Sequence, residues 1–190
     1  MARVVFVPIL ACGALAFGLP QSATTASSEQ APKIDRVGFP KDYRTRFRII
    51  GIDVRDEAPE VLTAYANELV PSATASAPRP LPDGSIIVME FAYALRDAQG
   101  NIVRDANGNV KTGEIEHVDV MKRGKGWGQA YGSNRSGNWE YVGYRLDGSY
   151  TTSPEASAKG AACHLKAGPA LDFVFPVSLP EHDRKEPNRR

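Results

Sequence analysis

The segment from Ser85 to Leu95 constrains the fold more than any other part of this chain. Its sequence, SIIVMEFAYAL, is apolar at almost every position and contains neither glycine nor proline. A run of this length that can be buried on both sides is typical of a strand in the middle of a sheet. The chain must therefore supply further strands on both sides of it and side chains to cover both of its faces.

Several other segments are suited to those neighbouring strands, because they are rich in β-branched and aromatic side chains. They are residues 47–54, 61–66, 114–121, 139–146 and 171–177. The segment 61–66 can also be interpreted as part of a helix that continues through Leu69, whereas 171–177 is expected to close the sheet.

Two glycine-containing segments, 97–101 and 105–109, follow the central strand. Each places a glycine after an amide residue, which is the pattern of a tight turn. The second segment and its neighbourhood also offer the oxygen donors of a calcium loop, namely Asp105, Asn107, Asn109 and Glu114. Its glycine comes two positions early and the loop is too short for an EF-hand, so we favour a hairpin turn.

The clearest helix signal lies between Ser153 and Gly168. Ser153 can cap the first turn, Pro154 and Glu155 are favoured within it, and Gly168 can end the helix. Together the elements predict an α+β fold, with a mainly antiparallel β-sheet, a few short helices, and one helix near the C-terminus.

That helix carries a residue pair with a specific chemistry, Cys163–His164. A Cys-x-x-Cys-His run attaches c-type haem through two thioether bonds and an iron–histidine bond. Here the run reads GAACH over 160–164, so Gly160 takes the place of the first cysteine. We expect His164 to bind iron and Cys163 to hold a haem c by a single thioether. The alternatives are an inert buried cysteine and a histidine that only caps the helix C-terminus.

The N-terminus has the composition of an export signal. Arg3 supplies a positive charge, the run 4–19 is almost wholly apolar, and small residues follow. We therefore expect 1–26 to be a signal peptide rather than a membrane span, and the mature protein to be periplasmic or secreted. A lipoprotein signal that ends at Cys12 is less favoured, because the apolar run continues beyond that residue.

The remaining chain divides into three parts. Residues 27–36 have no apolar period and are expected to form a disordered tether, 37–180 the folded domain, and 181–190 a polar tail. The chain has 23 basic and 22 acidic side chains, and removal of Arg3 with the signal makes the two numbers equal. That balance gives no reason to expect nucleic acid or an anionic membrane surface as a partner.

The order of several motifs resembles that of the cytochrome P-460 family, which includes the cytochromes c′-beta. The motifs are FPKDYR at 39–44, PDGS at 82–85, GNW at 137–139, AACH at 161–164 and DFVF at 172–175. The resemblance implies a small, exported, often dimeric, β-rich c-type cytochrome. Its iron would be five-coordinate, with one histidine below it and an open face above.

Three positions depart from the hydroxylamine-oxidising members of that family. Besides Gly160, Met89 stands where they carry a lysine cross-linked to the haem edge, and Leu62 where some carry a distal arginine. A methionine has no amine for such a cross-link, and a leucine supplies neither charge nor hydrogen bond. On composition Leu62, Met89 and Phe91 are core residues, and the resemblance makes them candidate cofactor contacts. An apolar pocket of this kind favours neutral gas ligands.

The resemblance therefore implies a haem protein that binds nitric oxide or a similar small ligand, with a redox partner protein and a homodimer as further expectations. The alternatives are an oxidoreductase acting on hydroxylamine or nitric oxide, and a haem-free binding or structural module. Glu140 is the acid that we consider as a distal proton acceptor, against an ordinary solvated glutamate. His117 is expected to be structural or exposed, and Glu90 to face away from Met89.

Overall fold

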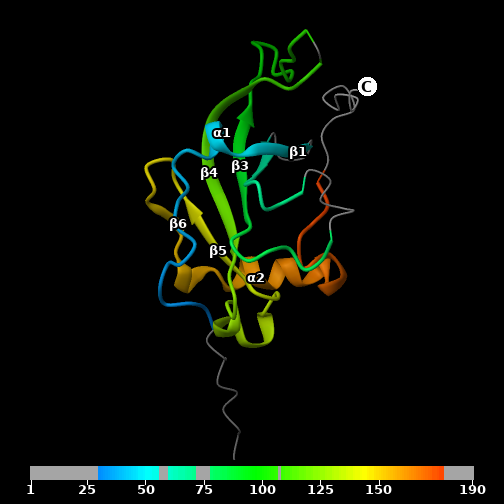
Figure 1. The fold of residues 1–190 in the computed structure, drawn as a ribbon. Helices are drawn as coiled ribbons and strands as arrows, with labels where there is room; N and C mark the ends of the chain where they lie inside the picture. Colours follow the sequence, from blue (N-terminus) through cyan, green and yellow to red (C-terminus); the bar gives the residue numbers. More distant parts are fainter. Residues whose placement is uncertain (1–29, 56–59, 72–77, 107, 178–190) are drawn as a thin grey trace, which may run out of the picture.

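The computed structural model describes residues 30–55, 60–71, 78–106 and 108–177. The signal peptide expected at 1–26 and the tail expected at 181–190 lie outside the described residues. Figure 1 shows the fold, in which a twisted sheet is crossed near one end by a short helix.

The sheet has six strands, and their spatial order is the same as their order in the sequence. The strands are β1 (Arg48–Arg55), β2 (Glu60–Ala66), β3 (Ile86–Ala94), β4 (Thr112–Arg123), β5 (Trp139–Tyr144) and β6 (Tyr150–Thr152). Every neighbouring pair is antiparallel. The predicted fold class is therefore confirmed, with β3 in the interior of the sheet and 61–66 a strand rather than a helix.

The helices are short and lie outside the sheet. They are the α-helices α1 (Tyr43–Arg46) and α2 (Ala158–His164) and the 3₁₀ helices η2 (Gln129–Asn134), η3 (Pro154–Ala156), η4 (Leu165–Ala167) and η5 (Pro169–Leu171). The helix expected between Ser153 and Gly168 is thus divided into η3, α2 and η4. Ser153 makes no capping hydrogen bond to the backbone, and its hydroxyl donates to Glu155 instead.

The prediction of a strand at 171–177 is wrong. Asp172 and Phe173 have positive φ angles of 50° and 61°, which turn the chain out of an extended conformation. Local and long-range bonds hold this turn, because the Phe173 amide donates to the Gly168 carbonyl and the Trp139 indole donates to the Asp172 carbonyl. The segment therefore packs against the sheet as an irregular chain and adds no strand.

The two predicted turns between β3 and β4 are confirmed. Gly100 and Gly108 have φ angles of 86° and 85°, and an aspartate three residues before each glycine accepts its amide hydrogen bond. The side chain of Asp105, which belongs to the alternative calcium loop, accepts a hydrogen bond from the Asn109 amide at 2.9 Å. Asn107 lies outside the described residues.

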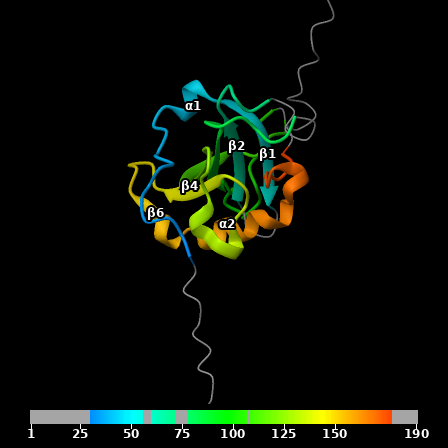
Figure 2. The ribbon, with the colours of Figure 1, turned by 60° about the horizontal axis from the view of Figure 1, so that its bottom comes forward.

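Each face of the sheet packs against a different part of the chain. We call the face with Met89, Asp119 and Tyr141 the site face, since its core includes Ala158 and Ala161 of α2. The reverse face packs under the segment before β1 and carries a second core of Val37, Tyr43, Val88, Val118, Val120, Val142 and Tyr144. Figure 2 shows α2 and α1 on opposite sides of the sheet.

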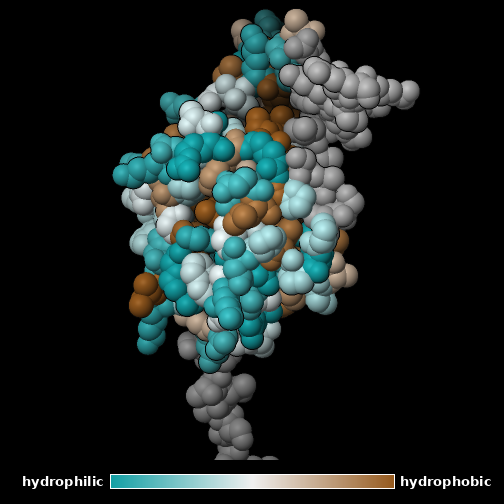
Figure 3. All heavy atoms as spheres, in the orientation of Figure 1, coloured by the Kyte–Doolittle hydropathy of each residue, from teal (hydrophilic) through white to brown (hydrophobic). Residues whose placement is uncertain are grey.

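The segment before α1 is bonded to the sheet. Asp35 and Arg36, which the sequence analysis places in the tether, contact residues of β5: Asp35 accepts a hydrogen bond from the Tyr144 hydroxyl at 2.7 Å, and Arg36 pairs with Glu140. The surface on the side seen in Figure 3 is largely hydrophilic, with hydrophobic residues interspersed among polar ones.

Candidate functional site

Helix α2 is built to lie close to the sheet. Ala158, Ala161 and His164 follow one another at intervals of three residues, so they lie on one face of the helix. All three are buried against the site face. The small alanine side chains let the helix approach the strands, and the helix ends at the larger imidazole. Cys163 lies on a neighbouring face of α2 and is exposed with a free thiol.

The imidazole of His164 is held in one orientation. Its Nδ1 lies 2.8 Å from the Phe173 carbonyl oxygen, and because a carbonyl can only accept, Nδ1 carries the hydrogen. The lone pair is therefore on Nε2. Tyr141 and Phe175 flank the ring, with centroids 4.7 Å and 5.2 Å away. This pattern, in which a backbone carbonyl fixes the tautomer, is typical of metal-binding histidines.

Burial also keeps this imidazole neutral. His164 is 7% exposed. Desolvation lowers the pKa of His164, and the hydrogen bond to the Phe173 carbonyl opposes this shift only in part. A neutral imidazole with a free Nε2 is the form that binds a metal ion.

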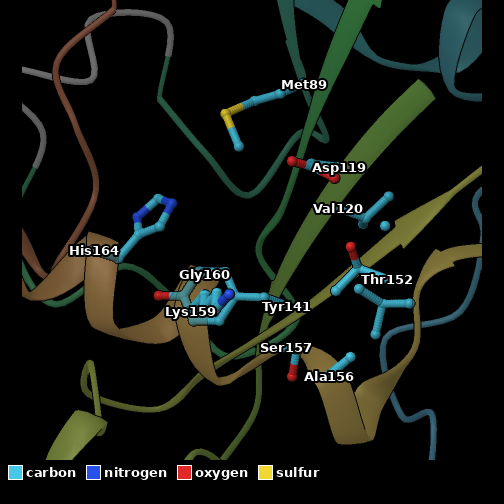
Figure 4. A pocket seen from close by; sticks show the side chains of 12 residues that line it. Met89, Asp119, Val120, Tyr141, Thr152, Ala156, Ser157, Lys159, Gly160 and His164 are labelled. Carbon is cyan, nitrogen blue, oxygen red and sulfur yellow. The ribbon is translucent and has the colours of Figure 1, made fainter. Parts of the chain in front are cut away.

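A cavity of about 210 Å³ lies between α2 and the site face. Met89 of β3, Asp119 of β4 and Gly143 of β5 are cross-strand neighbours and line it from the sheet. Gly160 and His164 line it from α2. Figure 4 shows Met89, Asp119 and His164 around this space. A second cavity of about 30 Å³, with an otherwise apolar lining, also borders Met89 and His164.

The residues present fit a c-type haem in kind. His164 offers Nε2 to iron, and Cys163, the preceding residue, offers a thiol. At Gly160 an added Cβ would lie 3.4 Å and 3.7 Å from atoms of Tyr141, which is ordinary packing distance. The cavity is smaller than the ~300–1,000 Å³ of common ligand pockets. A porphyrin therefore requires the surrounding side chains to separate, or one edge of the group to remain at the surface.

The structure brings only some of the predicted site residues together. Met89 and His164 border the same cavities. Leu62 and Phe91 lie on the same sheet face and are cross-strand neighbours, but they are buried in the packed core and line neither cavity. Phe91 stacks on His117, with ring centroids 4.3 Å apart.

The two glutamates on the reverse face pair with arginines and do not line the cavity. Glu140 is 1% exposed, pairs with Arg36, and accepts a hydrogen bond from the Gly128 amide at 3.3 Å. It is therefore neither a solvated glutamate nor a residue that borders the cavity. Glu90 accepts hydrogen bonds from Tyr43 and Arg44 on the same reverse face, so it does point away from Met89 as predicted.

The carboxylate that does border the cavity, Asp119, was missed by the sequence analysis. Partial desolvation raises the pKa of the half-exposed Asp119 side chain, and the nearby His117 opposes the shift. The signal was present in the sequence: Asp119 alternates with His117 and Met121 in a strand whose intervening residues are valines. Glu140 is the more conspicuous acid in the sequence because it directly follows the motif that ends at Trp139.

A buried neutral imidazole that faces a cavity, with a thiol on the preceding residue, is the arrangement expected of a c-type haem protein. The family model of cytochrome P-460 matches residues 40–176, so the chain belongs to the cytochrome P-460 family, as the order of motifs predicted. Membership implies a haem cofactor. None of the curated proteins compared with this chain matches it. Within the described ranges, no helix is both long enough and apolar enough to cross a membrane.

Proposed function

We propose that this protein is an exported c-type haem protein that binds nitric oxide or a similar small ligand at five-coordinate iron. His164 would bind the iron through Nε2, and Cys163 would attach the porphyrin through one thioether, because Gly160 has no thiol. When bound, the haem supplies an iron centre with an open coordination position. The observation that carries the proposal is the orientation of His164 by the Phe173 carbonyl, 2.8 Å from Nδ1.

The surroundings of the cavity support a small and largely apolar ligand. Met89 and Ala156 contribute apolar walls, and His164 is the only histidine among the described residues that line the cavity. Apolar walls exclude bulk water and offer few hydrogen bonds, which favours a neutral diatomic molecule over a charged one.

The experiment is periplasmic expression with haem-maturation proteins, followed by a pyridine haemochrome spectrum. One thioether leaves one vinyl group unsaturated, and the spectrum measures this difference from a doubly bonded haem. In the variant Cys163→Ala, acidified acetone should extract the haem that remains bound in the wild type. Nitric oxide added to the reduced protein should change the visible spectrum.

The control variant is Met89→Leu. If Met89 were a second axial ligand, its removal would change the spectrum of the protein before nitric oxide is added, and the five-coordinate proposal would be wrong. A colourless wild-type protein from a host that matures other c-type cytochromes would leave the haem-free module as the remaining interpretation.

The position of Asp119 on the cavity wall supports a second candidate function, the oxidation of hydroxylamine or nitric oxide. A carboxylate with a raised pKa on the cavity wall can take a proton from a bound substrate, as general base work requires. Turnover of hydroxylamine with an added electron acceptor, and its loss by about 100-fold or more in Asp119→Asn, would establish this activity. Binding of nitric oxide without turnover would leave the first function.

The location and partners of the protein complete the proposal. We place the mature chain in the periplasm or outside the cell, acting with a redox partner protein and as a homodimer. Cell fractionation, with mass spectrometry of the mature N-terminus, tests export and cleavage near residue 26. Sedimentation of the purified protein tests the dimer.

A further inference from the structure

A second titratable group lies beside Asp119 on the site face. His117 and Asp119 are two residues apart on β4, and side chains at that interval point to the same face of a strand. The His117 Nε2 atom lies 3.9 Å from Asp119 Oδ2, and its Nδ1 atom lies 3.7 Å from Glu116 Oε2. The first distance exceeds a direct hydrogen bond, so proton transfer between the two groups requires an intervening water molecule.

Asp119 stands between two spaces. On one side is the cavity that contains His164, and on the other is an open cleft of about 330 Å³ that is lined by His117, Arg145 and Thr151. Asp119 and Thr152 line both. Its side chain keeps 41% of its surface accessible, because it borders both spaces.

Two neighbours fix the geometry of this pair. Phe91 stacks on the His117 ring at an interplanar angle of 10°, which holds the imidazole edge towards Asp119. Gly143, the cross-strand partner of Asp119, leaves room for the carboxylate. A Cβ atom at Gly143 would lie 2.9 Å from Asp119 Oδ1 and 2.6 Å from the Thr151 hydroxyl.

We propose that His117 and Asp119 form a proton route between the outer cleft and the His164 cavity, in which His117 is a positioning residue that acts through Asp119. Inward, the proton on His117 Nε2 passes to the water while the water gives a proton to Asp119 Oδ2. This leaves a neutral imidazole and a neutral carboxyl group, and the imidazole regains a proton from solvent. Outward transfer reverses each step. The inference deepens the proposed function, since it serves ligands in that cavity that gain or lose protons.

Other charged groups face the pair from each neighbouring element. Glu116 on β4 lies on the Nδ1 side of His117, and Arg145 after β5 donates to the Tyr150 carbonyl at 3.0 Å. On the cavity side, Lys159 and His164 of α2 and Tyr141 of β5 share the lining with Asp119. A test must therefore separate His117 from Glu116, its nearest carboxylate neighbour.

The test is nuclear magnetic resonance of the Asp119 carboxyl ¹³C in the purified protein, titrated with acid. In His117→Phe, which keeps a ring to stack on Phe91, the Asp119 midpoint should move to higher pH because a positive neighbour is lost. The proton exchange rate at that midpoint, measured by relaxation dispersion, should fall by about tenfold or more, and added imidazole should restore it in His117→Ala. Glu116→Gln should change the rate less than twofold.

An Asp119 midpoint and exchange rate that are the same in wild type and His117→Phe would overturn the inference. So would a rate that falls equally in Glu116→Gln. The measurement needs no bound haem, so its result is independent of the haemochrome spectrum. A colourless protein with a coupled pair would contradict the proposed function alone, whereas a haem-loaded protein with an uncoupled pair would contradict this inference alone.

Discussion

The carboxylates on the two faces of the sheet have different partners. On the reverse face, Glu90 and Glu140 are both buried, and each is paired with an arginine, Arg44 and Arg36 respectively. On the site face, Asp119 has a histidine at 3.9 Å in place of an arginine, and it borders a cavity. An arginine holds a charge at every physiological pH, whereas a histidine exchanges protons near neutrality. The reverse face therefore holds its carboxylates in ion pairs with arginines, whereas Asp119 on the site face has a histidine neighbour and borders a cavity.

The largest effect is expected from the variant His164→Ala on the site face. It removes the imidazole that Phe173 orients, so haem per folded chain should fall by more than about tenfold, since loss of an orienting partner alone costs about 10–100-fold in affinity. The haemochrome assay measures the loss, and circular dichroism checks that the sheet is intact. The matched control His117→Ala should keep its haem. Equal haem content in both variants would contradict the assignment of His164.

The variant Arg36→Met tests the reverse face. It removes the cationic partner of the buried Glu140, while Arg36 itself is half-exposed, so we expect a loss of about 1–3 kcal/mol of unfolding free energy. Urea denaturation measures this change, while haem per folded chain should stay the same. Arg44→Met should cost less, because Glu90 keeps its hydrogen bond from Tyr43. Loss of haem in folded Arg36→Met would show that the two faces are coupled.

The lowered pKa of His164 predicts how the stability of the haem-free protein depends on pH. The folded state holds the imidazole neutral, whereas the unfolded chain takes up a proton below its ordinary pKa of about 6.5. The free energy of unfolding should therefore be highest above that pH and decrease as the pH falls through it. Urea denaturation at several pH values, compared with His164→Gln, isolates this contribution. A variant with the same pH dependence as the wild type would contradict it.

The smallest effect is expected from Gly160→Cys. An added Cβ there meets Tyr141 only at ordinary packing distances, so the folded protein should accept the side chain with a stability change of less than about 1 kcal/mol. The haemochrome spectrum should shift to that of a haem with no unsaturated vinyl group. Ala162→Cys places the thiol at the wrong interval and should leave one vinyl unsaturated. An unchanged spectrum in Gly160→Cys would place that position away from the porphyrin.

The sequence patterns predict the strands and turns of the sheet correctly, but they do not predict the segments that pack around the sheet as well. The long apolar run of β3 and the turns at Gly100 and Gly108 depend on neighbouring residues, so they can be recognised locally. The segment 171–177 also has strand composition, but the bond from the Trp139 indole to the Asp172 carbonyl decides its conformation. That contact joins residues 33 positions apart, and no local pattern contains it.

The candidate site also combines features that adjacent residues reveal with features that only distant contacts decide. Cys163 and His164 are recognisable because their chemistry depends on adjacent residues. The alternation of β4 assigns Asp119 to the same face as Met121, but only the cross-strand register places it between Met89 and Gly143. Glu140 has a comparable sequence context, but the alternation of β5 turns it to the reverse face, where Arg36 pairs with it. Which of two acids borders a cavity is thus decided by strand register and by distant partners.

The carbonyl that orients the imidazole belongs to Phe173, nine positions further along the chain than His164. In a chain that is synthesised from its N-terminus, Phe173 follows all six strands and helix α2. The tautomer of the His164 ring is therefore fixed only after the turn at Asp172 and Phe173 has formed. A group that binds Nε2 meets a fully oriented imidazole only from that point in folding onward.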